Sequence, residues 1–117
     1  SYREIYDLPN ISTMLRGTLR KKGFCSAWNI FVSLGMTDDS VLITNLGDMT
    51  WKSFLNSFLD YDNQNSVQQK LINKLSITSE ELKKLEWLGI LSDEKVKLSK
   101  GTPAQFLQEL LESKLQG

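Results

Sequence analysis

Histidine is absent from this sequence of 117 residues, which also holds only one cysteine and two prolines. Without histidine the chain has no imidazole metal ligand and lacks the side chain that most often serves as a general base. The single cysteine, Cys25, excludes a disulfide within the chain and favours a reducing compartment. We expect Cys25 to be buried as a small apolar residue, because a thiolate nucleophile would need a base that the chain does not supply.

An excess of charge of one sign is also missing, since 14 basic residues balance 14 acidic ones. A neutral chain exerts no long-range attraction on nucleic acid or anionic lipid, so neither is an expected partner. No apolar run approaches the roughly 20 residues of a membrane span, and residues 1–4 do not resemble a signal peptide. The patterns GxGxxG and Walker A are absent, and residues 60–63 begin like a calcium loop without its later ligands. No metal or cofactor site is therefore predicted in this chain.

The composition that remains is that of one folded domain. Hydrophobic residues make up 40% and charged residues 24% of the chain, which is typical of a globular protein with its own core. A nicotinamide enzyme with separate nucleotide and substrate domains would need roughly 100–200 residues for each. A complete enzyme of that kind does not fit in 117 residues.

The first part of the chain has a period of two. Ile11, Thr13, Leu15 and Gly17 would share one face of an extended segment, and glycine and threonine are weak helix formers. The pattern predicts a strand or extended arm at residues 12–20, with residues 1–21 belonging to a different structural unit from the rest. The neighbours that such a strand needs would lie outside this chain.

From residue 22 onward the period is helical, and residues 22–117 are predicted to form an all-helical domain. The first stripe begins at Phe24 and should end at Gly35 as a left-handed cap. Thr50 is typical of the N-cap of a second helix, and a third helix is expected at about residues 66–75. The fold class is therefore mainly α: about five short helices with one extended or β N-terminal arm at residues 12–20.

Two further helix starts carry strong sequence signals. Thr78 and Glu81 have the spacing of a capping box, and Thr102 and Gln105 repeat it, with proline following Thr102. Short amphipathic helices must pack together to be stable. All three tryptophans are therefore expected in the core, together with one aromatic and aliphatic set. That set is Trp51, Phe54, Phe58, Leu71, Leu85, Leu88, Phe106 and Leu110.

Residues 16–23 form the main concentration of candidate binding residues. In an extended segment Arg16, Thr18 and Arg20 would project to the same side, and arginine forks bind carboxylates through two parallel hydrogen bonds. Gly17 would let a ligand approach the backbone. The alternative interpretation is a solvated basic turn before a helix, and nucleic-acid binding is disfavoured because stacking aromatic residues are not interleaved with the charges.

Several segments together resemble a known enzyme family. They are residues 2–9 (YREIYDLP), 15–20 (LRGTLR), 23–24 (GF), 31–35 (FVSLG), 50–52 (TWK) and 86–94 (EWLGILSDE). The sequence is similar to the glutamate-forming saccharopine dehydrogenases, called saccharopine reductases in fungi and found as the C-terminal half of aminoadipic semialdehyde synthase in animals. The likeness covers nearly the whole chain and is most specific at residues 15–35 and 85–96.

The resemblance implies a function for the parent protein. Enzymes of this family interconvert saccharopine with glutamate and aminoadipate semialdehyde in lysine metabolism, using NADP bound by a separate Rossmann domain. The chain resembles the helical insertion in their substrate domain, so Arg16, Gly17, Thr18 and Arg20 are expected to contribute to substrate binding. The isolated chain should be inactive. The parent is expected to be cytoplasmic, or mitochondrial if it is an animal-type bifunctional enzyme, and a homodimer is one expected state.

One departure and one alternative accompany this resemblance. Lys21 occupies the position where the family usually has tyrosine, so a ring contact made there by the family is not expected here. The second class of function is a stand-alone helical protein-interaction module without catalysis. An exposed apolar patch would favour this module, whereas a basic groove beside residues 12–20 would favour the substrate domain.

Overall fold

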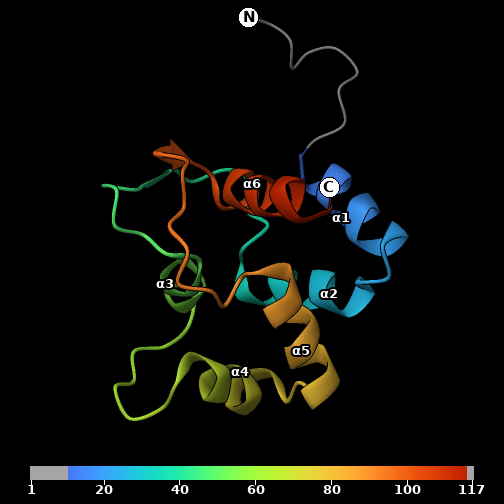
Figure 1. Ribbon diagram of the computed structural model, residues 1–117, viewed down its shortest axis with the longest axis vertical. Helices are drawn as coiled ribbons and strands as arrows, with labels where there is room; N and C mark the ends of the chain where they lie inside the picture. The colour runs from blue at the N-terminus through green and yellow to red at the C-terminus, as the bar shows by residue number, and fades with distance from the viewer. Residues whose placement is uncertain (1–10, 116–117) are drawn as a thin grey trace, which may run out of the picture.

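The computed structural model describes residues 11–115, and in this range the chain is mainly α, as predicted. In Figure 1, α6 and α1 lie at the top of the view, α2 and α3 in the middle, and α5 and α4 below them. The helices are α1 (Ile11–Lys21), α2 (Cys25–Leu34), α3 (Trp51–Asn56), α4 (Val67–Leu75), α5 (Ser79–Leu88) and α6 (Pro103–Leu115). Two short strands, β1 (Ile43–Thr44) and β2 (Lys100–Gly101), pair antiparallel.

The prediction of an extended arm at residues 12–20 is wrong, because this segment is the helix α1. Ile11, Leu15 and Leu19 recur every four residues, and the two leucines are buried where α1 packs on α2 and α6. Their burial outweighs the weak helix propensity of Gly17 and Thr18. A helix also satisfies its own backbone hydrogen bonds, so α1 needs no sheet from elsewhere. Residues 1–10 of the predicted arm lie outside the described residues.

The predicted helix starts are confirmed in detail. The Thr78 hydroxyl accepts a hydrogen bond from the Glu81 N–H at 3.1 Å, and the Glu81 carboxylate accepts one from the Thr78 N–H at 2.8 Å. Thr102 and Gln105 form the same reciprocal pair at 3.2 and 2.8 Å. Thr50 likewise caps α3. Each pair satisfies backbone N–H groups that the first helical turn leaves without partners.

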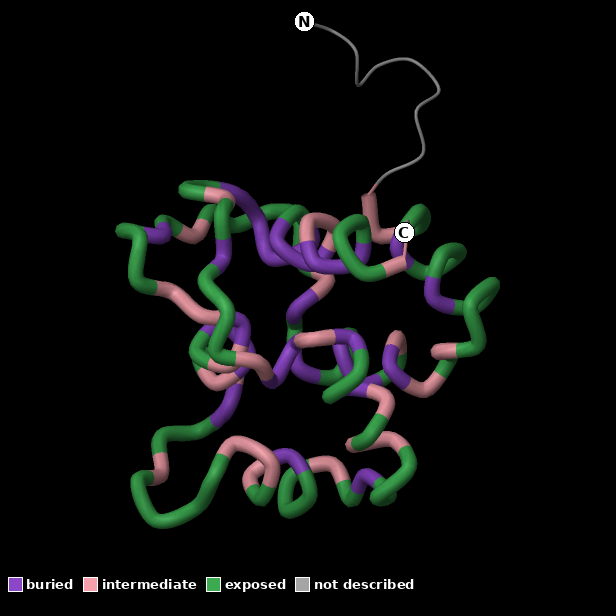
Figure 2. The backbone as a smooth tube through the Cα atoms, viewed as in Figure 1, coloured by how far each residue is buried: buried purple, intermediate pink, exposed green. Residues whose placement is uncertain are grey.

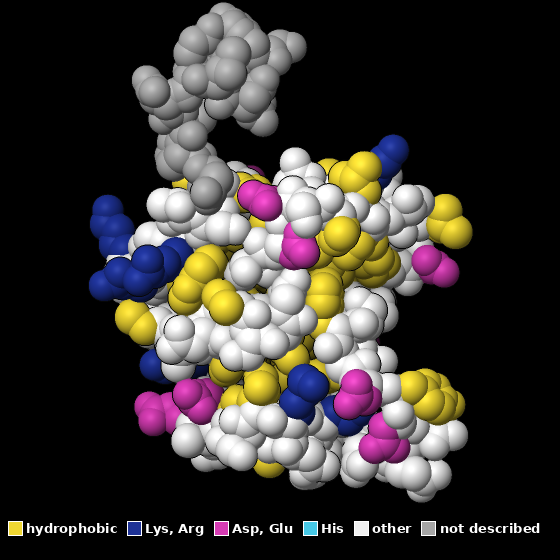
Figure 3. All heavy atoms as spheres, turned by 180° about the vertical axis from the view of Figure 1, so that it is seen from behind, with side chains coloured by type: hydrophobic (Ala, Val, Ile, Leu, Met, Phe, Trp, Pro, Cys, Tyr) yellow, Lys and Arg dark blue, Asp and Glu magenta, His cyan; other side chains and the backbone are white. Residues whose placement is uncertain are grey.

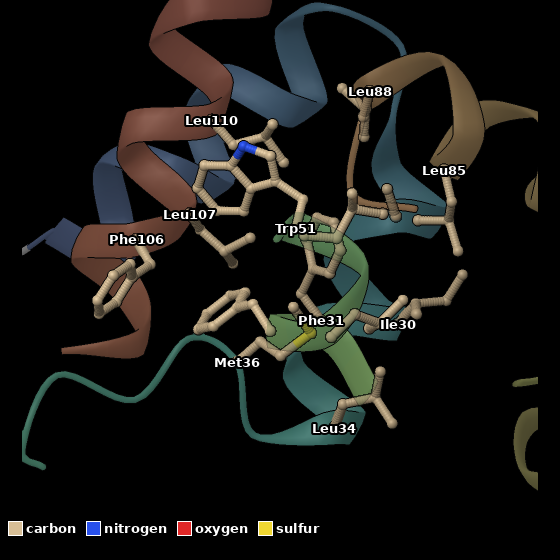
Figure 4. Packing of buried hydrophobic residues seen from close by; sticks show 14 of the residues in the cluster. Ile30, Phe31, Leu34, Met36, Trp51, Leu85, Leu88, Phe106, Leu107 and Leu110 are labelled. Atoms are coloured by element: carbon tan, nitrogen blue, oxygen red, sulfur yellow. The ribbon is translucent and has the colours of Figure 1, made fainter. Parts of the chain in front are cut away.

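The core lies between α6, α3, α2 and α5. In Figure 2 the buried backbone is concentrated on α2, α3 and α6, and Figure 4 shows the Trp51 indole lying against Leu107 and Leu110 of α6. Ring centroids of Phe54 and Phe106 are 5.2 Å apart. The predicted set is confirmed, since seven of its eight members are buried and Phe58 is partly buried. No helix in residues 11–115 has the length and apolarity of a membrane span.

The expectation that all three tryptophans are core residues holds fully only for Trp51. Trp28 is partly buried, and Trp87 remains 50% exposed. The Trp87 ring stacks on Phe24 with centroids 5.5 Å apart, and the Lys114 ammonium lies 4.7 Å from the indole centroid. An indole can therefore gain packing at the surface from a second ring and a cation without being enclosed.

The long connection after α2 begins as predicted, with Gly35 in a left-handed conformation at φ 86°. Farther along, the buried side chain of Asn45 donates to the Val96 and Leu98 carbonyls at 3.0 and 2.9 Å. Its carbonyl oxygen accepts from the Gly47 and Met49 N–H groups at 2.9 and 3.2 Å. This amide ties the loop to residues 96–98, together with the backbone hydrogen bond from the Asn45 N–H to the Ser99 carbonyl at 2.8 Å. The same loop exposes three large aliphatic side chains: Val41, Leu42 and Leu46.

Candidate functional site

The helical form of residues 11–21 decides which basic side chains act together. Residues four apart lie on the same face of a helix, so Arg16 and Arg20 project side by side from α1, and both are exposed. Lys21 and Lys22 follow at the end of the helix and are exposed too. Seen from behind in Figure 3, basic side chains gather at the left edge of the molecule, where α1 lies.

Arg16 and Arg20 face an open groove of about 550 Å³ between α1 and α2, which we call the arginine groove. Its lining consists of Arg16, Arg20, Cys25, Trp28, Asn29 and Val32. Within residues 11–115 neither guanidinium forms an ion pair or a hydrogen bond, and the ion pair recorded in this range joins Lys52 and Asp93 instead. The groove therefore offers unpaired guanidinium donors, an amide and an indole face to an anionic ligand.

The predicted site residues are only partly brought together. Arg16 and Arg20 share the groove, but Thr18 does not, because a residue two positions along a helix points to another side. Thr18 instead lines a second groove with Lys21 and Lys22. Gly17 is exposed, and a Cβ built there would meet no atom within 4 Å. That Gly17 admits a ligand to the backbone stays a prediction.

The sequence interpretation missed the part of the arginine groove that α2 supplies. Cys25, Trp28 and Asn29 lie at positions i, i+3 and i+4, on one face of α2. Cys25 is exposed, which contradicts the expected burial. It is the first residue of α2, where no turn of helix precedes it to cover its side chain. The helical spacing of these polar and aromatic residues was the available signal, but it could be recognised only once α1 was known to lie opposite.

The turn between α1 and α2 is held in place by several contacts. Gly23 adopts a left-handed conformation at φ 85°, and the Phe24 N–H donates to the Leu19 carbonyl at 2.7 Å. Trp87 of α5 stacks on Phe24, and the Lys84 ammonium lies 3.5 Å from the Gly23 carbonyl. The turn that joins α1 to α2 beside the arginine groove is therefore packed against α5.

The second groove lies between α1 and α6 and has a volume of about 410 Å³; we call it the lysine groove. It is lined by Met14, Leu15, Thr18, Lys21, Lys22, Gln108, Leu111, Glu112 and Leu115. Its floor is aliphatic and its rim is charged. The exposed Lys21 occupies the position where the family that the chain resembles usually has tyrosine.

The described residues show no arrangement for a metal or a dinucleotide. No group of three or more cysteine, aspartate or glutamate side chains in residues 11–115 is placed to hold a metal ion. The two strands in that range have two residues each, and neither is followed by a glycine-rich turn into a helix.

Comparison with known proteins shows which family the chain resembles along its length. The family model of the saccharopine dehydrogenase C-terminal domain matches residues 1–117. The mitochondrial alpha-aminoadipic semialdehyde synthase of Bos taurus is 36% identical over 101 residues, and that of Rattus norvegicus is 35% identical over 116 residues. The saccharopine dehydrogenase (NADP(+), L-glutamate-forming) of Pyricularia oryzae is 30% identical over 122 residues.

The matched segment is a small part of each relative. The alignments cover 81%, 94% and 98% of this chain, but only 11% of the bovine, 12% of the rat and 27% of the fungal protein. The chain thus spans about a quarter or less of the length of these curated relatives. No solved structure is significantly similar to the chain.

Proposed function

Since the chain belongs to the family of the saccharopine dehydrogenase C-terminal domain, we propose that it is the helical substrate-side domain of a saccharopine dehydrogenase. The parent enzyme interconverts saccharopine with glutamate and aminoadipate semialdehyde, with NADP as the hydride carrier, in lysine metabolism. The names of the fungal relatives, which are saccharopine dehydrogenases (NADP(+), L-glutamate-forming), support both the reaction and the cofactor. NADP is held by parts of the enzyme outside these 117 residues.

The observation that carries this proposal is the arginine groove. Saccharopine has three carboxylates, and Arg16 and Arg20 point two unpaired guanidinium groups into one open groove. A guanidinium binds a carboxylate through two parallel N–H···O bonds, which fix the orientation of the ligand as well as its position. Asn29 adds an amide that donates or accepts, and Trp28 adds an apolar wall. The domain's part in the reaction is to bind and orient the substrate.

The parent polypeptide is also the proposed partner of the exposed loop at residues 41–46. Leu46 is 88% exposed and Leu42 64% exposed, although Asn45 holds the loop in one conformation. A rigid loop that displays aliphatic side chains is typical of a surface that another part of a protein covers. This patch equally favours the alternative function, a stand-alone interaction module, but that alternative leaves the unpaired arginines unexplained.

Location and oligomeric state follow the parent enzyme in this proposal. The animal relatives are named as mitochondrial enzymes, so an animal-type parent would be mitochondrial and another parent cytoplasmic. A homodimer of the parent remains part of the proposal, with its interface outside the arginine groove so that substrate can enter.

A chimeric enzyme tests the proposed function directly. The matched segment of the Pyricularia oryzae enzyme would be replaced by this chain, and NADP-dependent oxidation of saccharopine would be measured. We expect the chimera to retain activity, because the chain should supply an equivalent wall of the substrate site. A chimera that melts cooperatively and binds NADP but shows no saccharopine oxidation would contradict the proposal.

Variants of the chimera then locate the substrate contact. Arg16→Ala should lower kcat/KM for saccharopine by roughly tenfold to several hundredfold, because hydrogen bonds to charged groups contribute about 1.5–3 kcal/mol each. Arg16→Lys should restore only part of this loss, since an ammonium cannot form the fork. Arg20→Ala should act in the same direction, and Lys83→Ala, at an exposed position on α5, is the matched control. Unchanged kinetics for both arginine variants would support the solvated basic turn instead.

A further inference from the structure

A third groove lies between α6 and the stretch at residues 92–97, and we call it the tryptophan groove. It has a volume of about 560 Å³, and its lining includes Trp51, Leu88 and Leu110. These three side chains are buried members of the core, so the base of the groove is largely apolar. The groove shares no lining residue with the arginine groove.

One polar group at this base has no partner. Trp51 is only 4% exposed, and its indole N–H donates no hydrogen bond to any atom of residues 11–115. In Figure 4 the indole nitrogen is on the side of the ring toward Leu110 and away from Phe31 and Met36. The side-chain atom of this range that is fully buried without a partner is Asn56 Oδ1, so the Trp51 nitrogen still reaches the groove surface. A largely buried donor without an acceptor costs free energy, which an acceptor on an occupant of the groove would recover.

The rim of the tryptophan groove carries charges of both signs. Glu109 is already engaged, since its carboxylate accepts the Lys97 and Leu98 N–H groups at 3.0 and 2.9 Å. Within residues 11–115, four exposed side chains of the rim form no ion pair and no side-chain hydrogen bond: Glu86, Glu94, Lys95 and Lys97. Two free carboxylates and two free ammonium groups suit an occupant that itself carries both charges.

We propose that a segment of the parent polypeptide outside these 117 residues lies in the tryptophan groove, with a backbone carbonyl that accepts the Trp51 N–H. Charged side chains of this segment pair with the free carboxylates and ammonium groups of the rim. The proposal rests on the proposed function in one respect, which is that the chain is one domain of a longer enzyme. The matched segment is 11% of the bovine relative and 27% of the fungal one, so most of such a parent lies outside this chain.

The chemistry of the groove favours a polypeptide over a small ion. A simple anion or cation would meet two unpaired rim charges of its own sign, whereas a peptide carries a neutral carbonyl for the neutral indole and side chains of either sign. The α6 side of the groove extends from Glu109 to Lys114, about 7.5 Å along the helix axis. An extended segment can therefore lie along it, and the arginine groove stays open for substrate.

The test compares Trp51 in the 117-residue chain, which has its own core, with Trp51 in the full-length parent enzyme. Solvent exchange of the indole N–H groups is followed by NMR on isotope-labelled tryptophan, and Trp51→Phe identifies the resonance. The Trp51 N–H should exchange at least about tenfold more slowly in the parent, because exchange then requires the segment to leave the groove. Trp28, which lines the arginine groove, is the internal control and should exchange at similar rates in both proteins.

Charge reversal tests the pairing at the rim. Glu86→Lys/Glu94→Lys should speed exchange of the Trp51 N–H in the parent by about two- to thirtyfold, the range that two exposed ion pairs give, and should leave it unchanged in the 117-residue chain. The matched control, Asp60→Lys/Glu80→Lys, reverses two exposed carboxylates outside the groove and should change neither rate.

Several outcomes would overturn the proposal. They are equal exchange of Trp51 in chain and parent, equal slowing of all three tryptophans, a charge reversal without effect, and slowing that depends on protein concentration, which would assign the groove to a second copy. Saccharopine oxidation is measured on the same parent sample. An active parent with an unprotected Trp51 would remove this contact and leave the proposed function standing, whereas an inactive parent with a protected Trp51 would do the reverse.

Discussion

Replacing Gly17 by alanine should stabilise the protein, because Gly17 lies in the interior of helix α1. The backbone at this position is helical, and a Cβ built there meets no atom within 4 Å. The added methyl group therefore costs no packing strain, while it restricts the unfolded chain and favours the helix. The substitution also distinguishes the helix from the extended arm that the sequence pattern had predicted.

The expected size of the effect follows from helix propensities. Glycine in a helix interior is less favourable than alanine by about 0.8–1.0 kcal/mol, and Gly17 is exposed, so packing should not alter this difference. We expect Gly17→Ala to raise the free energy of unfolding by about 0.5–1 kcal/mol. Gly17→Val should stabilise less than alanine, because a β-branched side chain loses rotamer freedom in a helix.

Urea unfolding followed by tryptophan fluorescence measures these differences, since Trp51 is buried in the core. The matched control is Gly35→Ala. A Cβ at Gly35 also meets no atom within 4 Å, but its φ is 86°, so the same substitution should destabilise by about 1–2 kcal/mol. If valine stabilises more than alanine at position 17, or if alanine destabilises there, residues 12–20 are extended and the reasoning fails.

Three further predictions address the loop, the pH dependence and activity. Asn45→Ala should lower the free energy of unfolding by about 2–4 kcal/mol in the same assay, because it removes four hydrogen bonds of a buried amide; a loss below about 1 kcal/mol would contradict that role. Hydrogen bonds from the Ser40 hydroxyl and N–H hold the pKa of Asp38 below its usual value, so its stabilising contribution should be present above about pH 4 and be lost as the pH falls through the folded pKa. A carboxyl NMR titration checks this, and Ser40→Ala should move the pKa of Asp38 upward. The purified 117-residue chain should show no NADP-dependent saccharopine oxidation, and turnover above a chain-free blank would refute this.

Local signals in the sequence predicted the helices from residue 24 onward well. The capping pairs that begin with Thr78 and Thr102 act between residues three positions apart, so their hydrogen bonds depend little on the rest of the fold. Gly35 ends α2 for a similarly local reason. The core set around Trp51 was predictable because each helix has one apolar face and the faces can be buried only against one another.

The first helix could not be predicted by the same means. Its sequence contains a period of two through Thr13 and Gly17 and a period of four through Ile11, Leu15 and Leu19. The weak helix propensity of glycine and threonine favoured the period of two, which predicts an extended segment. Burial of the two leucines against α2 and α6 decided for the second, and that burial is a property of the assembled fold.

For the candidate site, too, one part could be predicted from the sequence and another part depends on the fold. The sequence alone determined that residues 16–22 concentrate positive charge and that their arginines suit carboxylates, because this follows from side-chain chemistry. Only the tertiary structure decided which of these residues act together. Once α1 is a helix, Arg16 and Arg20 meet Trp28 of α2 in one groove, while Thr18 and Lys21 face α6 in another. Charge is carried by each residue, whereas the partners that surround it depend on helix geometry and on packing between segments far apart in the chain.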